Sequence, residues 1–341
     1  MKAVFFFLPF LCLPLFAADA ETLTQEGLAL HDQGKYSQAI EKYKEALKAG
    51  GNDWLLQYEM CFSSYANNDI PGAVNYCRES IRLRSKGNDV AYMRLGTIYD
   101  NLGKPDSAVQ MYAQGLKDNP DSYMLKYNMA ITKIGQHKIK EAYDFAMQAT
   151  ENTKTHGGSY YVTGVLADSL GLWANEYAYT LYSLLIRGNE PGRMRESMNR
   201  LYARNKSLVK VAKHGDETDS VIITLPSKGQ ESGNFDFAFM TCVALGIAQD
   251  SANGIPLYGT KIGNYEFLVK STIPAIDMLA ESNVRFSLKN FYSDLKEGQY
   301  EESFARLIFS PLSDKEYSSW LILNGGKMSA FKKWLRTEYF K

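Results

Sequence analysis

Residue types that could carry out catalysis occur in the chain, but their spacing forms no known catalytic arrangement. Zinc hydrolysis, acyl transfer, phosphate binding and dithiol redox chemistry would be indicated by HExxH, GxSxG, a Walker loop and CxxC, and the sequence contains none of them. The four histidines lack the spacing of metal ligands: His31, His137, His156 and His214. We therefore expect no catalytic residue, no cofactor and no metal site.

Two short sequences resemble reactive features and have simpler explanations. Gly157-Gly158-Ser159 could be a phosphate loop or a nucleophile turn, but it falls at a junction between helical segments, where we expect only a chain break. Glu301-Glu302 lies in a charge-rich helical pattern, and we expect both carboxylates to be solvated, because acid–base work requires burial to shift a pKa. We expect His31 and His137, near the turns of helical hairpins, to be solvated as well.

Three cysteines lie beyond the first 20 residues: Cys61, Cys77 and Cys242. Cys61 and Cys77 fall on facing helices of one predicted hairpin, so an exported protein could join them in a disulfide. Both also occupy positions that require a small buried side chain, and free cysteine behaves as a small hydrophobe. The sequence leaves these alternatives open. We expect Cys242, in the apolar segment 235–248, to be inert core.

The elements that position these residues are helical hairpins. Asp89–Ser122 has the pattern of a helix, a turn and a second helix: Gly103 marks the turn and Pro105 begins the second helix. Gly96 is small where the two helices must approach closely, and Tyr112 fills the space beside it.

The same pattern recurs with a period of 34 residues, in the segments 20–53, 54–87, 123–156 and 157–190. The second segment lacks the turn glycine, and the last has Glu176 where alanine is expected. One hairpin cannot bury its apolar face alone, so neighbours must stack. The series resembles the tetratricopeptide repeat (TPR) and is similar to secreted or periplasmic bacterial TPR proteins without assigned function. The resemblance implies an all-α, right-handed solenoid of about five repeats over residues 21–190, with a concave inner surface.

The resemblance also implies a binding groove, because first-helix positions 2, 5, 9 and 12 of each repeat face the concave side in TPR families. The mapped groove residues are Tyr58, Phe62, Tyr65, Met93, Asp100, Tyr127, Ile131, Tyr161 and Asp168, accompanied by Thr97, Ile134 and Val165. The lysines and asparagines of the family's carboxylate-clamp subclass are absent there, so we expect a peptide or helix with an apolar face as the ligand. Alternatively, the rings pack between repeats, or the C-terminal module covers them.

The N-terminal residues 1–20 have the pattern of a cleaved signal peptide. Lys2 precedes the apolar stretch Phe5–Phe16, which is too short to span a bilayer, and Ala18-Asp19-Ala20 places small residues before a cut at Glu21. We therefore expect an exported protein, periplasmic or secreted, that does not span a membrane after cleavage.

Beyond the array we expect a capping helix at 191–213, a linker at 214–234 and a helical C-terminal module at 235–341. Within the linker, Val221–Leu225 could be extended. The helical patterns of the module are 235–248, 265–280, 288–295, 300–308, 315–323 and 328–340, and the stretch 313–316 has the pattern of a capping box. Because 297–304 echoes the turn sequence 33–40, one further degenerate hairpin is expected there.

The charge balance of the chain argues against nucleic-acid binding. The 38 basic and 38 acidic residues cancel, and no basic run is present to bind nucleic acid. We predict a non-catalytic protein–protein interaction scaffold of the cell envelope that binds a peptide or helix segment of another protein. Two alternatives remain: an envelope enzyme whose C-terminal module carries the activity, and a self-capped structural protein that forms homo-oligomers.

Overall fold

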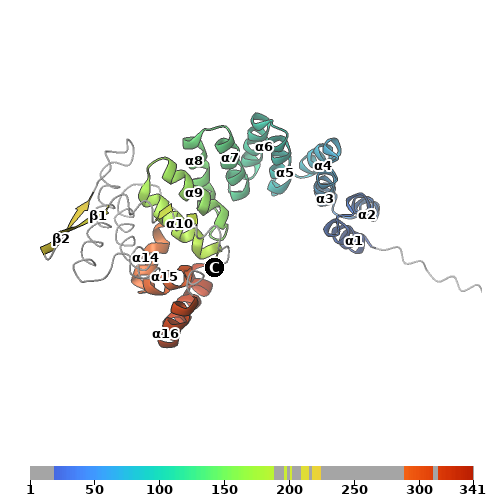
Figure 1. Cartoon of the computed structure of the whole chain (residues 1–341). Helices are drawn as coiled ribbons and strands as arrows, with labels where there is room; N and C mark the ends of the chain where they lie inside the picture. The colour runs from blue at the N-terminus through green and yellow to red at the C-terminus, as the bar shows by residue number, and fades with distance from the viewer. Residues whose placement is uncertain are drawn as a thin grey trace, which may run out of the picture. The chain divides into compact units, whose positions relative to one another are not determined.

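The computed structural model describes residues 19–187, 196–197, 200–201, 209–214, 217–223, 288–309 and 314–340 (Figure 1). The predicted signal peptide up to residue 18, the helical patterns 235–248 and 265–280, and Cys242 lie outside these ranges. The chain divides into two compact units, 1–120 and 121–341.

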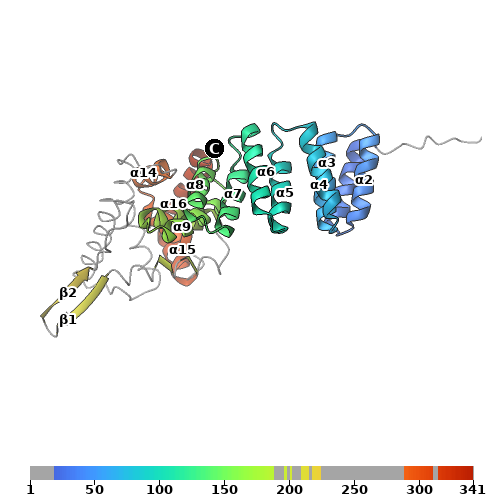
Figure 2. The ribbon, with the colours of Figure 1, turned by 90° about the horizontal axis from the view of Figure 1, so that it is seen from above.

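The first unit consists of three helical hairpins. Their helices are α1 (Ala20–Asp32) and α2 (Tyr36–Lys48), α3 (Asp53–Ala66) and α4 (Ile70–Leu83), and α5 (Asp89–Asn101) and α6 (Pro105–Asp118). Each hairpin packs against the next, α2 against α3 and α4 against α5, so that neighbouring helices stand side by side (Figure 2). This is the stacking that the sequence period predicts, and it buries apolar faces that a single hairpin would leave in water.

Each hairpin of the array turns at one residue with positive φ. These residues are Gly34, Asn68, Gly103, His137 and Gly171. The N–H of the next residue donates to the carbonyl five positions earlier, as Lys35 does to Leu30 at 2.9 Å, which closes the end of the helix. Asparagine enters the left-handed region more easily than most residues, so Asn68 replaces the missing glycine.

The close approach predicted at Gly96 is present. A Cβ atom at Gly96 would lie 2.7 Å from Cδ1 of Tyr112, and one at Gly27 would lie 2.6 Å from Cδ1 of Tyr43. Both tyrosines are fully buried. The glycine therefore makes room for the ring that fills the hairpin, in the first and third repeats alike.

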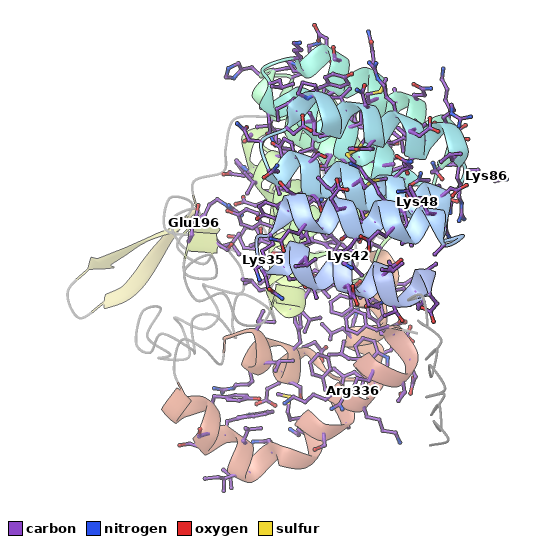
Figure 3. The ribbon with its side chains drawn as sticks, turned by 90° about the vertical axis from the view of Figure 1, so that its right-hand side faces the viewer. Lys35, Lys42, Lys48, Lys86, Glu196 and Arg336 are labelled. Atoms are coloured by element: carbon purple, nitrogen blue, oxygen red, sulfur yellow. A yellow bond between two sulfur atoms is a disulfide. The ribbon has the colours of Figure 1, made fainter. Side chains whose placement is uncertain are left out.

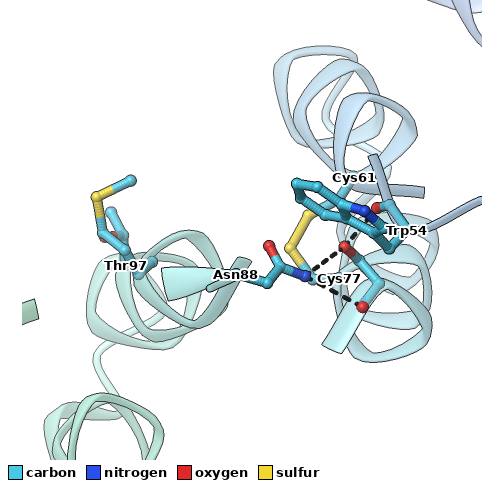
Figure 4. Close-up of a disulfide and its surroundings, with 7 residues drawn as sticks. Trp54, Cys61, Cys77, Asn88 and Thr97 are labelled. Carbon is cyan, nitrogen blue, oxygen red and sulfur yellow. Dashed lines mark hydrogen bonds between the residues drawn. A yellow bond between two sulfur atoms is a disulfide. The ribbon is translucent and has the colours of Figure 1, made fainter. Parts of the chain in front are cut away.

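A disulfide between Cys61 and Cys77 joins α3 to α4, with the Cα atoms 5.2 Å apart (Figure 4). This decides between the two alternatives that the sequence left open. Beside it, the buried amide of Asn88 donates to the Ser80 hydroxyl at 3.0 Å, and that hydroxyl donates to the Trp54 carbonyl at 2.6 Å. The second hairpin is thus closed covalently and tied to the start of the third by hydrogen bonds.

Surface charges on the first hairpin are balanced locally. Lys42 and Lys48 lie on the surface of α2 (Figure 3). The Lys42 ammonium is 3.0 Å from a carboxylate oxygen of Glu26 and 3.0 Å from one of Glu45. Such pairing is in keeping with a chain of zero net charge.

The second unit begins with two more hairpins and continues into the C-terminal elements. The hairpin helices are α7 (Tyr123–Gly135), α8 (Ile139–Glu151), α9 (Gly157–Ser169) and α10 (Trp173–Arg187). The following elements are β1 (Val209–His214), β2 (Glu217–Ile223), α14 (Lys289–Glu297), α15 (Glu301–Phe309), α16 (Asp314–Trp334) and the π-helix η2 (Leu335–Tyr339). One continuous apolar core runs from α7 and α8 through α10 to the C-terminal helices.

The C-terminal helices pack against α10 through aromatic rings. Tyr182 of α10 meets Phe291 of α14 edge-on, with the ring centroids 4.8 Å apart. The hydroxyl of Tyr292 donates to the carbonyl of Ala178 at 2.7 Å. These contacts cover the last repeat, which would otherwise expose the apolar face that a further repeat would bury.

The expected capping helix and linker require correction. Residues 196–197 and 200–201 are helical, but Val209–Lys213 belongs to β1, and β2 occupies 217–223 inside the expected linker. The two strands pair antiparallel, with Val211 opposite Val221. Valine and isoleucine favour strands, and here this preference overrides the helical pattern that was expected as far as residue 213. The extended conformation expected from Val221 is confirmed as far as Ile223.

The rest of the predicted fold class is confirmed: stacked helical hairpins are followed by mainly helical C-terminal elements, and the β-hairpin is the addition. The extra hairpin is present as α14 and α15, although the residue with positive φ is Gln299 and not the glycine before it. The two predicted helices, 315–323 and 328–340, are confirmed as the two parts of α16, which are separated by a kink at the non-helical residue Asn324; the second part continues into η2. Ser313 of the predicted capping box lies outside the described residues.

Candidate functional site

The groove residues predicted in the first unit lie on first helices, as expected. Tyr58, Phe62 and Tyr65 are on α3, and Met93 and Asp100 are on α5, all partly buried. Tyr65 is held in place across the repeat boundary, because its hydroxyl accepts a hydrogen bond from the side-chain amide of Asn101 at 2.6 Å.

Phe62 is the centre of a row of side chains that crosses three consecutive first helices. On one side its ring packs against His31 of α1, with the centroids 4.4 Å apart. On the other side, the guanidinium carbon of Arg94 of α5 lies 4.0 Å from the Phe62 centroid. His31 is fixed in turn by its Nδ1, which is 2.8 Å from the Ser63 hydroxyl. We call His31, Phe62 and Arg94 the inner row.

Charges beside the inner row are incompletely paired. Burial raises the pKa of Glu59, and the nearby Arg94 opposes that shift only in part. Burial lowers the pKa of His31; Asp32 opposes this and Arg94 adds to it. Arg94 forms no ion pair with another described residue, and its Nε is buried without a hydrogen bond there. A guanidinium held over an aromatic ring, with an N–H donor that has no partner among the described residues, can bind a carboxylate or carbonyl oxygen of a ligand.

Sequence reasoning missed two members of this row. His31 was expected to be solvated, but its ring packs against residues of α2 and α3. Its centroid lies 5.1 Å from that of Tyr36 on α2, and the ring also contacts Phe62 on α3. Arg94 was not among the mapped positions. The available signal was the spacing: His31 and Ser63 are 32 positions apart, as are Phe62 and Arg94, so side chains of adjacent first helices meet slightly below the 34-residue period. His137, by contrast, is exposed as expected.

In the second unit the predicted residues lie on α7 and α9. Tyr127 is partly buried against His156, with the ring centroids 4.9 Å apart and the planes nearly perpendicular. Ile131 is 37% exposed, the most accessible of the predicted set. Tyr161 and Asp168 lie on α9 and are partly buried. The first helices of this unit therefore carry a second partly exposed face.

The sequence Gly157-Gly158-Ser159 begins α9, in agreement with the expected chain break. His156 precedes it as the N-cap, and its Nδ1 accepts from the backbone N–H of Ser159 at 3.2 Å. The His156 side chain therefore caps the N-terminus of α9, whose first backbone N–H groups have no partner within the helix.

Glu176 explains why the fifth repeat departs from the pattern. Its carboxylate is fully buried on α10 and accepts from Nε of Arg200 at 3.0 Å. Nη2 of Arg200 also donates to the Thr180 hydroxyl, at 3.1 Å. The position where alanine was expected thus carries one half of a buried ion pair to the segment after the array.

In the described part of the C-terminal module, a pocket bears on the enzyme alternative. A pocket of about 350 Å³ is lined by Asp294, Glu297, Gly298, Tyr300, Trp334, Glu338 and Tyr339. Its lining has no histidine, serine or cysteine. Among the described residues, no group of histidine, cysteine and acidic side chains could hold a metal ion.

The Glu302 carboxylate was expected to be solvated, but it accepts a hydrogen bond from the Trp320 indole N–H at 2.8 Å. Within the described ranges, no helix combines the length and apolar character needed to cross a membrane.

Comparison with known proteins agrees with the hairpin geometry. Residues 90–122, nearly all of α5 and α6, match the sequence profile of the tetratricopeptide repeat family. The chain therefore contains a tetratricopeptide repeat (TPR) at these residues. The profile covers one hairpin, and the other four hairpins share its turn geometry.

Similar proteins match only part of this chain. The BBSome complex member BBS4 of Bos taurus is 25% identical over 152 residues, which are 44% of this chain and 28% of that protein. The matched region is therefore less than a third of the relative. Similar solved structures include TTC0263, a thermophilic TPR protein of Thermus thermophilus, at 16% identity and TM-score 0.44, covering 54% of this chain and 99% of that one. Another is pilF of Pseudomonas aeruginosa, at 14% identity and TM-score 0.44, covering 55% and 82%.

Proposed function

We propose that this protein is a non-catalytic scaffold that binds a peptide or helical segment of another protein on the exposed faces of its first helices. The observation that carries the proposal is the inner row, in which Phe62 is clamped between side chains from both neighbouring repeats. An aromatic ring fixed on both sides loses little conformational entropy on binding, which is typical of an interface anchor.

The chemistry of the inner row indicates the kind of ligand. Tyr58 and Phe62 offer apolar surface with limited exposure, and Arg94 offers N–H donors with no ion-pair partner among the described residues. A segment with an apolar side chain next to a carboxylate or a backbone carbonyl would satisfy both. Because Glu59 lies nearby, a ligand with a further acidic group next to it would be repelled.

Capture of the partner tests the proposal. A photo-cross-linking amino acid at position 58 or 131 should trap a protein in native cells, while the same amino acid at position 44, on the second helix α2, should not. Affinity of the isolated pair is then measured for Arg94→Gln and Ile131→Asn. We expect losses of about tenfold if either residue is an interface anchor.

Matched controls separate binding from folding. Arg82→Gln alters an arginine on the second helix α4, and Leu83→Asn alters a residue 38% exposed, against 37% for Ile131. Both controls should bind normally. If Arg94→Gln and Ile131→Asn bind as tightly as their controls, the partner does not use the first-helix faces.

We also propose that the chain is exported to the cell envelope. The Cys61–Cys77 disulfide supports this, because structural disulfides persist mainly in oxidising compartments. Mass spectrometry of the protein from its native cells, without reductant, should find the oxidised pair and an N-terminus at or near Glu21. A cut there would remove Asp19, whose carboxylate caps α1 by accepting from the Thr22 N–H at 2.7 Å. Retention of residues 1–20 with both thiols reduced would contradict export.

A further inference from the structure

The pocket of the C-terminal module has aromatic walls and an acidic rim. Asp294 and Glu297 come from α14, Glu338 comes from η2, and all three side chains are exposed at the mouth. Within the part of the chain that the structure describes, no residue forms a hydrogen bond or an ion pair with these three carboxylates. The lining contains no basic residue. Lys296 and Arg336 lie on the same two elements but outside the lining.

The wall of the pocket is a stack of three rings. Trp334 is 8% exposed. Its ring packs against Tyr300, with centroids 5.3 Å apart, and against Tyr339, at 5.5 Å. The faces of aromatic rings carry the negative charge of the π-systems. The aromatic wall and the acidic rim therefore both attract positive charge.

This aromatic cluster already holds one ammonium group. The Nζ of Lys154 lies 4.9 Å from the centroid of the Tyr339 ring and donates to the Tyr339 carbonyl at 2.7 Å. Lys154 is not one of the lining residues, so within the described part of the chain the three carboxylates of the rim still have no partner. The contact between the Lys154 ammonium and the Tyr339 ring indicates that the other rings of the pocket could also bind a cation.

We propose that this pocket binds an organic cation with N–H donors, a guanidinium or primary ammonium group. Aromatic walls bind cations with or without donors. The three carboxylates accept hydrogen bonds, which a quaternary ammonium cannot supply. A planar guanidinium satisfies both surfaces, since it stacks on rings and donates in pairs to carboxylates. A volume of about 350 Å³ suits one such group and its aliphatic stem. This inference is independent of partner binding by the first helices.

Titration of the full chain with small probes tests the proposal. N-acetyl-argininamide should bind with a Kd of about millimolar, measured by calorimetry or ligand-observed NMR. N-acetyl-citrullinamide, its neutral isostere, and choline, which has no N–H donor, should bind at least about fivefold more weakly. Glu297→Gln and Glu338→Gln should each weaken N-acetyl-argininamide about fivefold, and high salt should weaken it further.

The control variant is Glu196→Gln, which removes an exposed carboxylate outside the pocket lining (Figure 3). It should bind like the wild type, and all variants should melt like the wild type because every substituted side chain is exposed. Free L-arginine binding more tightly than N-acetyl-argininamide would indicate a free amino acid as the source of the cation, and the reverse order would indicate a side chain of a protein. Equal binding of citrullinamide or choline, or no effect of the two pocket substitutions, would overturn the proposal.

Discussion

The buried ion pair between Glu176 and Arg200 yields the sharpest prediction on stability. Glu176 is 0% exposed and the Arg200 side chain is 19% exposed, with 3.0 Å between Nε and Oε1. Arg200→Met removes the cation and leaves the carboxylate in the core. Breaking a buried pair in this way costs about 3–5 kcal/mol, and the partial exposure of Arg200 places the expected loss of unfolding free energy near the lower end.

Removing both charges should restore most of that stability. The double variant Glu176→Ala, Arg200→Met places alanine where the other repeats have a small residue. Replacing a buried pair by apolar side chains is often neutral, so we expect the double variant to lie within about 1 kcal/mol of the wild type. Glu176→Ala alone leaves an arginine that can still reach solvent and Thr180, and should cost less than Arg200→Met. The coupling between the two sites should be about 3 kcal/mol.

Urea denaturation of the four proteins at pH 7 measures this cycle, and a second series in mild acid adds a check on the mechanism. Burial raises the pKa of Glu176, and Arg200 opposes the shift. A raised native-state pKa means that the neutral acid is favoured in the fold, and the destabilisation grows as pH rises through that pKa. The cost of Arg200→Met should therefore shrink in acid. An Arg200→Met variant as stable as the wild type at pH 7, or a double variant no better than it, would refute the reasoning.

Three further predictions concern the first unit. Reducing the Cys61–Cys77 disulfide, which joins residues 16 positions apart, should lower the unfolding free energy by about 3 kcal/mol; an unchanged urea midpoint with reductant would contradict this. Gly96→Ala should cost about 1–3 kcal/mol through the clash with the buried ring, whereas Gly135→Ala, which meets open space at the end of α7, should be neutral or stabilising in the same thermal melts. Burial raises the pKa of Glu59, so its native state loses stability as pH rises through that pKa, and Glu59→Gln should raise the melting temperature at pH 7 but not below about pH 4, where an unfolded glutamate is protonated. A gain from Glu59→Gln that is equal at both pH values would exclude this explanation.

The helical hairpins could be predicted because their determinants are local. The residue at each turn must reach positive φ, and in the first and third repeats the residue opposite the buried tyrosine must be small, so these positions recur at the repeat period. The first-helix location of Tyr58, Phe62 and Tyr127 followed from the period alone. What each of these rings contacts did not follow.

Those contacts depend on side chains from neighbouring helices. His31 and Arg94 join Phe62 only because stacking brings α1, α3 and α5 together, which the composition of any one helix does not record. The pocket at Trp334 likewise combines α14, the turn before α15, the end of α16 and η2, and its lining residues lie up to 45 positions apart along the chain, from Asp294 to Tyr339.

The sequence by itself determined the repeating unit and the positions of its turns, because these depend on periodicity and on the backbone preferences of a few residues. The tertiary structure alone decided that Cys61 and Cys77 are joined, that Glu176 is paired with Arg200, and that the C-terminal helices cover α10. Burial and pairing are properties of distances between segments, and the amino-acid order constrains those distances only through the packing of the whole unit.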